Sequence, residues 1–143
     1  MNIRKLFYVF LFFALSTIIA DARVRYTDEM KGYIGTWTHT NNLGDISAYR
    51  ICVSDGWVVV LYKFEDHFSD GTYYEGALNE KRTIDYTFQN GKFYFDRDYP
   101  RAYNSVTLEL KEGSLIETIK QRGRDDKGRE YSRTWSVVYE LDF

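Results

Sequence analysis

Alternation of apolar and polar residues with a period of two is the pattern that most restricts the fold of this chain. Ile84, Tyr86 and Phe88 alternate with polar residues, and Val106 and Leu108 continue the pattern later in the chain. Beyond the N-terminal segment, no run of ten or more residues keeps the 3.6-residue apolar spacing of an amphipathic helix, and the chain contains a single proline. β-Branched and aromatic residues, which favour strands, are concentrated in the alternating runs. We therefore predict an all-β protein.

Clusters rich in glycine, asparagine and aspartate separate the alternating runs and supply the positive φ angles that tight hairpins require. They occur at residues 41–44, 54–56, 69–71, 90–91, 112–113 and 123–128. The segments between them predict nine strands, within a range of eight to ten: Gly35–Thr40, Ile46–Val53, Trp57–Asp66, Thr72–Leu78, Arg82–Gln89, Lys92–Asp96, Ser105–Lys111, Ser114–Arg122 and Tyr131–Leu141.

The predicted strands follow one another closely and most have one apolar face, which favours an antiparallel meander. An open meander would leave unpaired strand edges, whereas closure of the sheet removes them. We therefore predict a single antiparallel up-and-down β-barrel. The segment Trp57–Tyr62 is apolar on both faces, so we expect residues Val24–Ile34 to cover its outer side.

Residues 1–22 have the features of a cleaved signal peptide. Two basic residues precede an apolar run over residues 6–19, and residues 20–22 have the small-x-small pattern that signal peptidase accepts. The run has about 14 residues, fewer than the roughly 20 that span a hydrocarbon core, so we expect no retained membrane span. The prediction is a secreted or periplasmic protein whose barrel domain covers residues 23–143.

Charge and cysteine content exclude some classes of partner and of fold. The formal net charge is −2, and we interpret the basic residues as dispersed, so nucleic acid is not an expected partner. Cys52 is the only cysteine, which excludes a disulfide within the chain. An apolar core must then stabilise the fold, and a domain of this length can bury one.

Gly35-Thr36-Trp37, on the first predicted strand, resembles the Gly-x-Trp signature that opens lipocalins and related calycin barrels. In that superfamily a basic residue near the start of the last strand packs across this tryptophan and closes the base of the barrel. Arg133 lies on the same predicted face as Trp135 and matches that position. The middle of the chain is also similar to the small secreted lipocalin-like domains of bacteria. The resemblance implies a contact between Trp37 and Arg133.

The resemblance further implies that the barrel binds a small hydrophobic or amphipathic molecule, inside it or at its mouth. An eight-stranded barrel has room for one small ligand or for a complete filling of side chains. The candidate lining residues are large rings assigned to the interior, namely Tyr49, Trp57, Tyr73, Tyr86, Phe88, Phe93, Phe95, Trp135 and Tyr139. Rings at this density could fill the interior, so a barrel without an internal ligand is an open alternative.

Three charged residues, Lys63, Glu65 and Glu117, fall on interior positions if the alternation of their strands is assigned correctly. A narrow cavity lined by these groups and by tyrosine hydroxyls would suit a partly polar ligand. Exposed ion pairing is the more ordinary interpretation of such residues, and it is the one we adopt.

A second class of function is recognition of a protein or a glycan by aromatic rings on the outside of a filled barrel. The candidates for such a surface are Tyr62, Phe68, Tyr73, Tyr74 and Tyr94. A third class, an isomerase or cyclase built on a calycin barrel, requires polar groups that converge in a pocket.

The chain lacks the residue patterns typical of catalytic or metal sites, and we predict a non-enzymatic protein without a cofactor. Cys52 has no histidine at a spacing that suggests a nucleophile with its base. His39 and His67 lack a third ligand for a transition metal. Residues 123–128 lack the alternating ligands and the terminal glutamate of a calcium loop, so we interpret them as a long hairpin turn.

Overall fold

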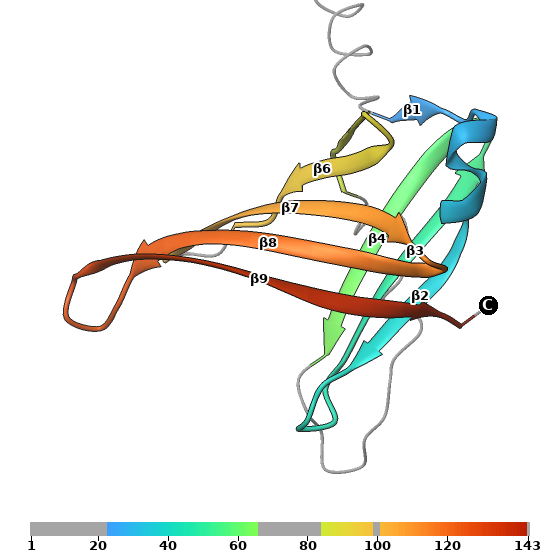
Figure 1. The fold of residues 1–143 in the computed structure, drawn as a ribbon. Helices are drawn as coiled ribbons and strands as arrows, with labels where there is room; N and C mark the ends of the chain where they lie inside the picture. Colours follow the sequence, from blue (N-terminus) through green and yellow to red (C-terminus); the bar gives the residue numbers. More distant parts are fainter. Residues whose placement is uncertain (1–22, 66–83, 99–100, 143) are drawn as a thin grey trace, which may run out of the picture.

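A computed structural model describes residues 23–65, 84–98 and 101–142 of the chain. Strands dominate this part, together with one short 3₁₀ helix, so the all-β prediction is confirmed (Figure 1). The elements are β1 (Val24–Arg25), η1 (Asp28–Tyr33), β2 (Gly35–Thr40), β3 (Ile46–Ser54), β4 (Trp57–Glu65), β5 (Thr87–Gln89), β6 (Lys92–Asp96), β7 (Ala102–Lys111), β8 (Ser114–Arg124) and β9 (Glu130–Leu141).

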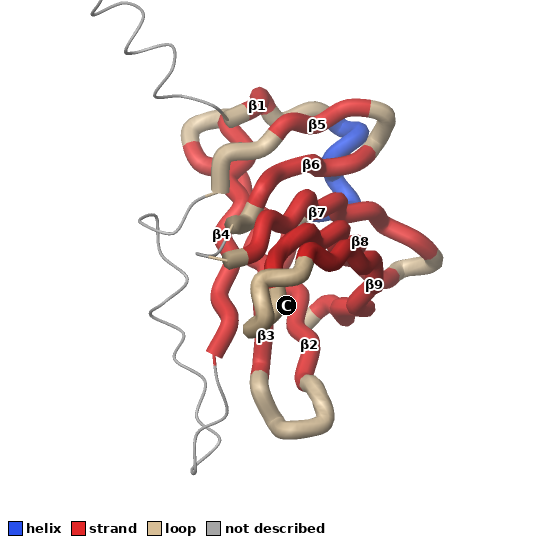
Figure 2. Tube along the Cα trace, turned by 90° about the vertical axis from the view of Figure 1, so that its left-hand side faces the viewer, coloured by secondary structure: helices blue, strands red, loops and turns tan. Residues whose placement is uncertain are grey.

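In the described residues, a single antiparallel sheet of nine strands curls into a nearly closed barrel, as predicted (Figure 2). The strand order is β1-β4-β3-β2-β9-β8-β7-β6-β5, so the first long strand pairs with the last one. Trp37 of β2 lies opposite Leu141 of β9 in this pairing. The two edges of the sheet, β1 with β4 on one side and β5 on the other, approach each other. The amide of Ile84, just before β5, donates to the Val60 carbonyl of β4 at 2.8 Å.

The hairpin turns follow directly from the sequence. Three of them place a non-glycine residue and then a glycine at positive φ, namely Asp55 and Gly56, Asn90 and Gly91, and Glu112 and Gly113. Two successive positive φ angles define the type I′ turn, whose twist matches that of the flanking strands. The predicted boundaries of β2, β3 and β6 agree with the structure to within one residue.

Other predicted segments differ from the structure or lie outside the described residues. The predicted strand Arg82–Gln89 is shorter, because regular pairing begins only at Thr87. The predicted strand Thr72–Leu78 and the predicted signal peptide, residues 1–22, lie outside the part of the chain that the structure describes.

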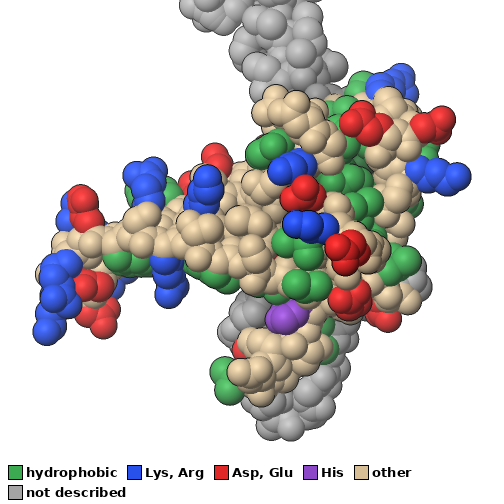
Figure 3. Space-filling model, in the orientation of Figure 1, with side chains coloured by type: hydrophobic (Ala, Val, Ile, Leu, Met, Phe, Trp, Pro, Cys, Tyr) green, Lys and Arg blue, Asp and Glu red, His purple; other side chains and the backbone are tan. Residues whose placement is uncertain are grey.

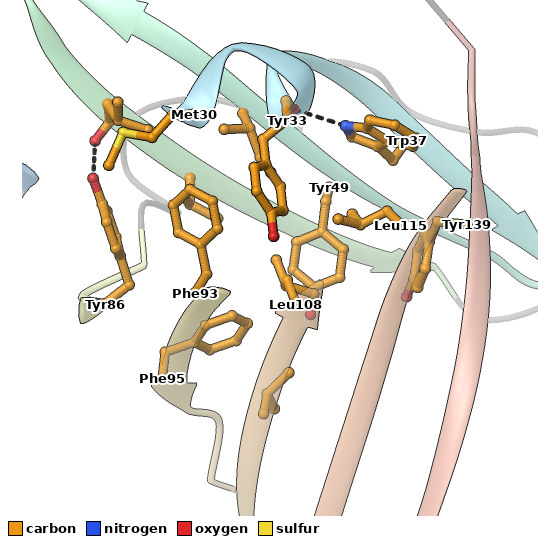
Figure 4. Close-up of a cluster of buried hydrophobic side chains, with 14 of the residues drawn as sticks. Met30, Tyr33, Trp37, Tyr49, Tyr86, Phe93, Phe95, Leu108, Leu115 and Tyr139 are labelled. Atoms are coloured by element: carbon orange, nitrogen blue, oxygen red, sulfur yellow. Dashed lines mark hydrogen bonds between the residues drawn. The ribbon is translucent and has the colours of Figure 1, made fainter. Parts of the chain in front are cut away.

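Aromatic and aliphatic side chains from both halves of the sheet fill the interior at one end of the barrel (Figure 4). The ring of Tyr49 lies 5.2 Å from that of Tyr139 and 6.1 Å from that of Phe95, measured between centroids. Phe93 and Leu108 are fully buried beside them. The buried members of this cluster are Met30, Tyr33, Trp37, Tyr49, Ile51, Val58, Val60, Tyr86, Phe93, Phe95, Val106, Leu108, Leu115, Ile119 and Tyr139.

The η1 segment closes this end of the barrel. Tyr33 of η1 enters the core, where its hydroxyl donates to the Gly91 carbonyl at 2.6 Å and accepts from the Leu110 amide at 3.2 Å. The Trp37 indole donates to the Tyr33 carbonyl at 2.9 Å. Apart from Arg25, whose guanidinium stacks on Trp57, the segment Val24–Ile34 therefore does not cover the outer side of β4, and that prediction is wrong. The buried Met30 and Tyr33 side chains draw the segment over the interior instead.

Strand β4 is apolar on both faces, as predicted, but its faces are the reverse of the predicted assignment. Val58 and Val60 belong to the interior cluster, whereas Val59 and Leu61 form a second buried cluster on the opposite face. Alternation gives no contrast along such a strand, so the sequence does not indicate which face is inward.

Strands β7, β8 and β9 extend beyond the rest of the sheet as a three-stranded projection (Figure 1). We call residues 101–104 and 120–133 the arm. Strand β2 pairs with β9 only at Leu141 and Glu140. Within the described residues, the rest of β9 pairs with β8 alone, so both faces of the arm lie outside the closed part of the barrel.

Candidate functional site

A buried ion pair lies in the interior, beyond the aromatic cluster. Glu117 of β8 is 1 % exposed, and Arg97, which follows β6, donates from Nη1 to the Glu117 Oε2 atom at 2.9 Å. The Tyr49 hydroxyl donates to the same carboxylate oxygen. The Tyr139 hydroxyl lies 3.2 Å from Oε1 of Glu117 and 3.0 Å from the Ser47 hydroxyl. Both carboxylate oxygens are therefore engaged by donors, from strands β3 and β9 and from Arg97.

The two tyrosines of this cluster act as neutral hydrogen-bond donors. Burial, and secondarily the Glu117 carboxylate, raise the pKa of the Tyr49 and Tyr139 hydroxyls well above the usual range. The charged form of each phenol would be a second buried anion beside Glu117, which is strongly unfavourable. The Arg97 guanidinium supplies the compensating charge and stacks 4.1 Å from the centroid of the Tyr62 ring.

The predicted role of Glu117, exposed ion pairing, is wrong. Its inward position on β8 was visible in the alternation, but its partner follows another strand and could not be identified from spacing. Lys63 shares the outward face of β4 with Leu61, so it does not reach the interior. The side chain of Glu65 lies outside what the structure describes.

The inner face of β6–β9 changes from apolar to polar toward the arm. Register places Phe95, Val106, Ile119 and Trp135 side by side in one transverse row. The next row consists of Arg97, Asn104, Gln121 and Arg133.

The polar row is organised by the Gln121 amide. Its Nε2 donates to the Asn104 side chain at 2.9 Å, and its Oε1 accepts from the Tyr131 hydroxyl at 3.1 Å and from Arg133 Nε at 2.9 Å. The guanidinium of Arg133 then lies 4.9 Å from the centroid of the Trp135 ring. Within the described residues, the two terminal nitrogens of Arg133 have no protein acceptor, and the side chain is exposed. This part of the surface thus presents a half-buried indole next to an oriented cation.

The expected contact between Arg133 and Trp37 is wrong. Trp37 pairs with Leu141, and Arg133 precedes Leu141 by eight positions on β9. At about 3.3 Å per residue this separation is roughly 26 Å, well beyond the reach of an arginine side chain. Gly35 and Trp37 do begin the strand that pairs with β9, and Trp37 is 2 % exposed. The basic residue, however, belongs to the arm.

Most of the predicted lining residues lie on the inner face of the sheet. Tyr49, Tyr86, Phe93, Phe95 and Tyr139 are buried there, while Phe88 and Trp135 pack against them and are partly buried.

Of the two remaining predicted lining residues, one lies on the outer face and the other is not tested. Trp57 shares the outward face of β4, where the Arg25 guanidinium lies 4.3 Å from the centroid of its ring, so its predicted interior position is wrong. Tyr73 lies outside the described residues.

The residues considered for catalysis or metal binding lie apart from one another. Cys52 packs against the outer cluster of Ala48, Val59 and Leu61. His39 contacts the Val138 carbonyl at 3.1 Å through Nδ1. His67 lies outside the described part of the chain, and in that part no three His, Cys, Asp or Glu side chains gather as a metal site. Residues 125–129 form a hairpin turn in which Asp125 accepts from the amides of Lys127 and Arg129, as predicted for a turn.

No protein-family model, curated protein or solved structure matches this chain. Among the described residues, no helix has the length and apolar character needed to cross a membrane.

Proposed function

We propose that this protein is a non-enzymatic, secreted or periplasmic binding protein of the lipocalin-like type. Its ligand is a small amphipathic molecule that binds where the barrel interior meets the inner face of the arm. Export rests on the features of residues 1–22, and the lipocalin-like assignment rests on the Gly-x-Trp motif and the barrel topology.

The observation that carries the proposal is the step from the apolar row to the polar row. Trp135 and Val137 offer partly buried apolar surface, and Arg133 next to them has terminal nitrogens that are not used within the described structure. The apolar part of a ligand can pack on the indole while its carboxylate or sulfonate group binds the guanidinium. The planar guanidinium suits such anionic groups because it can donate two hydrogen bonds to them. Because Gln121 already holds the guanidinium in place, little side-chain entropy remains to be lost on binding.

Packing in the closed end argues against a ligand deep in the barrel. Tyr49, Phe93, Leu108 and Leu115 are fully buried and contact their neighbours in one cluster. A ligand there would have to displace the ion pair of Glu117 with Arg97, which costs several kcal/mol. The mouth beside the arm carries no such cost.

The test uses anilinonaphthalene sulfonate, an aromatic amphiphile with one anionic group, and follows its fluorescence on binding. Trp135→Ala and Arg133→Gln should each weaken binding roughly tenfold, the loss expected for a packed ring or a charge-assisted hydrogen bond. The matched controls are Trp57→Ala and Arg25→Gln, because these residues form a similar stacked pair on the outer face of the sheet. The near-UV circular dichroism of each variant must match the parent, since the dye also binds loosened structures.

The proposal is overturned if the control variants weaken dye binding as much as the variants of Trp135 and Arg133 do. It is also overturned if the variants of Trp135 and Arg133 bind the dye as the parent does. Native mass spectrometry of protein purified from its natural host then identifies the natural ligand as a co-purified mass.

A further inference from the structure

The arm concentrates positive charge in a chain that is acidic as a whole. Residues 120–133 carry six basic and three acidic side chains, against a formal net charge of −2 for the entire sequence. Arg101, which directly precedes β7, lies in the same region, and Figure 3 shows Lys and Arg side chains along the arm. The interpretation of the basic residues as dispersed is therefore wrong, because the β8–β9 hairpin brings the basic residues of its two strands close together.

Internal ion pairs neutralise only part of this charge. Arg124 pairs with Glu130 at 3.0 Å, and Arg129 pairs with Asp125 at 2.9 Å. In the described structure, Arg122 and Lys120 have no carboxylate partner. They lie two positions apart on β8 and share its outer face, about 7 Å from each other along the strand.

An exposed aromatic ring lies next to these cations. Tyr103 is 56 % exposed and pairs across the strands with Arg122, whose guanidinium is 5.9 Å from the centroid of the ring. The two side chains contribute to a hollow of about 690 Å³ at the arm tip, whose lining also includes the charged residues Arg101, Arg124, Asp125 and Glu130.

Hydroxyl side chains surround the free cations on this face. Lys120 lies between Ser105 of β7 and Thr134 of β9, and Arg122 lies between Tyr103 and Ser132. The outer face thus alternates cations with hydroxyl groups, and its exposed large ring is a tyrosine.

We propose that the outer face of the arm binds an acidic glycan, a chain of sugars with carboxylate or sulfate groups. Spaced cations match the spaced acid groups of such a polymer, the hydroxyls match its neutral sugar hydroxyls, and Tyr103 offers a flat ring for one sugar face. This surface is distinct from the small-ligand site, which uses the opposite face of the same strands.

Two other anionic partners fit the surface less well. A nucleic acid carries a charge at every phosphate, whereas the arm holds three acidic residues and two unpaired cations on this face. A lipid membrane favours apolar side chains that insert between its head groups, but the neighbours of Tyr103 here are hydroxyls and cations.

The experiment measures binding of a galacturonic acid hexamer to the full mature chain by isothermal titration calorimetry. Binding should be detectable at about 50 mM salt and weaken clearly at about 300 mM, because exposed charges are screened. The methyl-esterified hexamer, which has the same sugars without the charge, should bind at least tenfold more weakly. Arg122→Gln and Tyr103→Ser should each weaken binding of the acidic hexamer by roughly fivefold to tenfold.

Lys111→Gln is the matched control, because Lys111 is exposed on the outer face of β7 but lies at the end far from the arm. Trp135→Ala should also leave glycan binding unchanged, which separates this proposal from the small-ligand site. The proposal is overturned if the acidic and esterified hexamers bind alike, if Lys111→Gln weakens binding as much as Arg122→Gln, or if the hexamer does not bind. Tighter binding to single-stranded DNA or to anionic phosphatidylglycerol vesicles would also overturn it.

Discussion

Removing the charge of Glu117 should destabilise this protein more than removing the charge of any exposed carboxylate. In Glu117→Gln the Arg97 guanidinium, whose side chain is 16 % exposed, keeps its charge but loses its anion. Leaving one partner of a buried pair uncompensated costs about 3–5 kcal/mol. That is a large share of the roughly 5–15 kcal/mol by which a domain is stable.

Urea denaturation followed by tryptophan fluorescence measures the free energy of unfolding. With a slope of about 1–3 kcal/mol per molar urea, the midpoint should fall by roughly 2 M. Glu109→Gln is the control, because Glu109 pairs with Lys92 at 3.6 Å while their side chains are 41 % and 36 % exposed. An exposed pair of this kind contributes about 0–1 kcal/mol.

A double variant separates the charge effect from a simple packing defect. Arg97→Met combined with Glu117→Gln removes both charges, so it should recover much of the stability lost in Glu117→Gln alone. Equal losses of stability in Glu117→Gln and Glu109→Gln would contradict this explanation. A double variant that loses the full sum of the two single losses would contradict it as well.

Three further predictions follow from the same packing. Because the pKa values of Tyr49 and Tyr139 are raised, the folded protein keeps protons that the unfolded chain releases above about pH 10, so stability should be full below that pH. It should fall by about 1.4 kcal/mol per pH unit per residue above it, and urea midpoints across alkaline pH measure this. Trp37→Ala should cost about 3–5 kcal/mol in urea denaturation, whereas Arg133→Ala should cost less than about 1 kcal/mol, because only the indole is buried. Similar losses in the two variants would contradict this geometry. Gly123→Ala should lower the melting temperature by several degrees, because its Cβ would lie 2.7 Å from two oxygen atoms, and an unchanged melting temperature would show that the arm relaxes freely.

The polar core could be predicted only in part. Alternation on β8 placed Glu117 with Leu115 and Ile119, which is an inward position, and the sequence therefore contained the signal. The partner was not predictable, because Arg97 follows β6 and reaches Glu117 only through the curvature of the sheet. Side-chain contacts between segments about 20 residues apart depend on register, which local composition does not encode.

The proposed binding surfaces could likewise be predicted only in part. The rings of Phe93 and Phe95 could be assigned to one face from alternation alone. The stacking of Arg133 on Trp135, and its distance from Trp37, follow from how far β9 extends past β2. The resemblance correctly indicated a barrel. Arg133, however, lies too far along β9 to contact Trp37 and stacks on Trp135 instead.

The strands, the type I′ turns and the two-faced character of most of the sheet are encoded locally, because they depend on alternation and on backbone φ preferences within a few residues. Three features arise only when the whole sheet folds: β2 pairs with β9, Val58 and Val60 lie on the inner face of β4, and the basic hairpin projects as an arm. Those features depend on pairing between distant segments and on which apolar face gains more burial. Strand pairing and the burial of an apolar face are properties of the whole closed sheet, because each needs a partner strand that lies far away in the sequence.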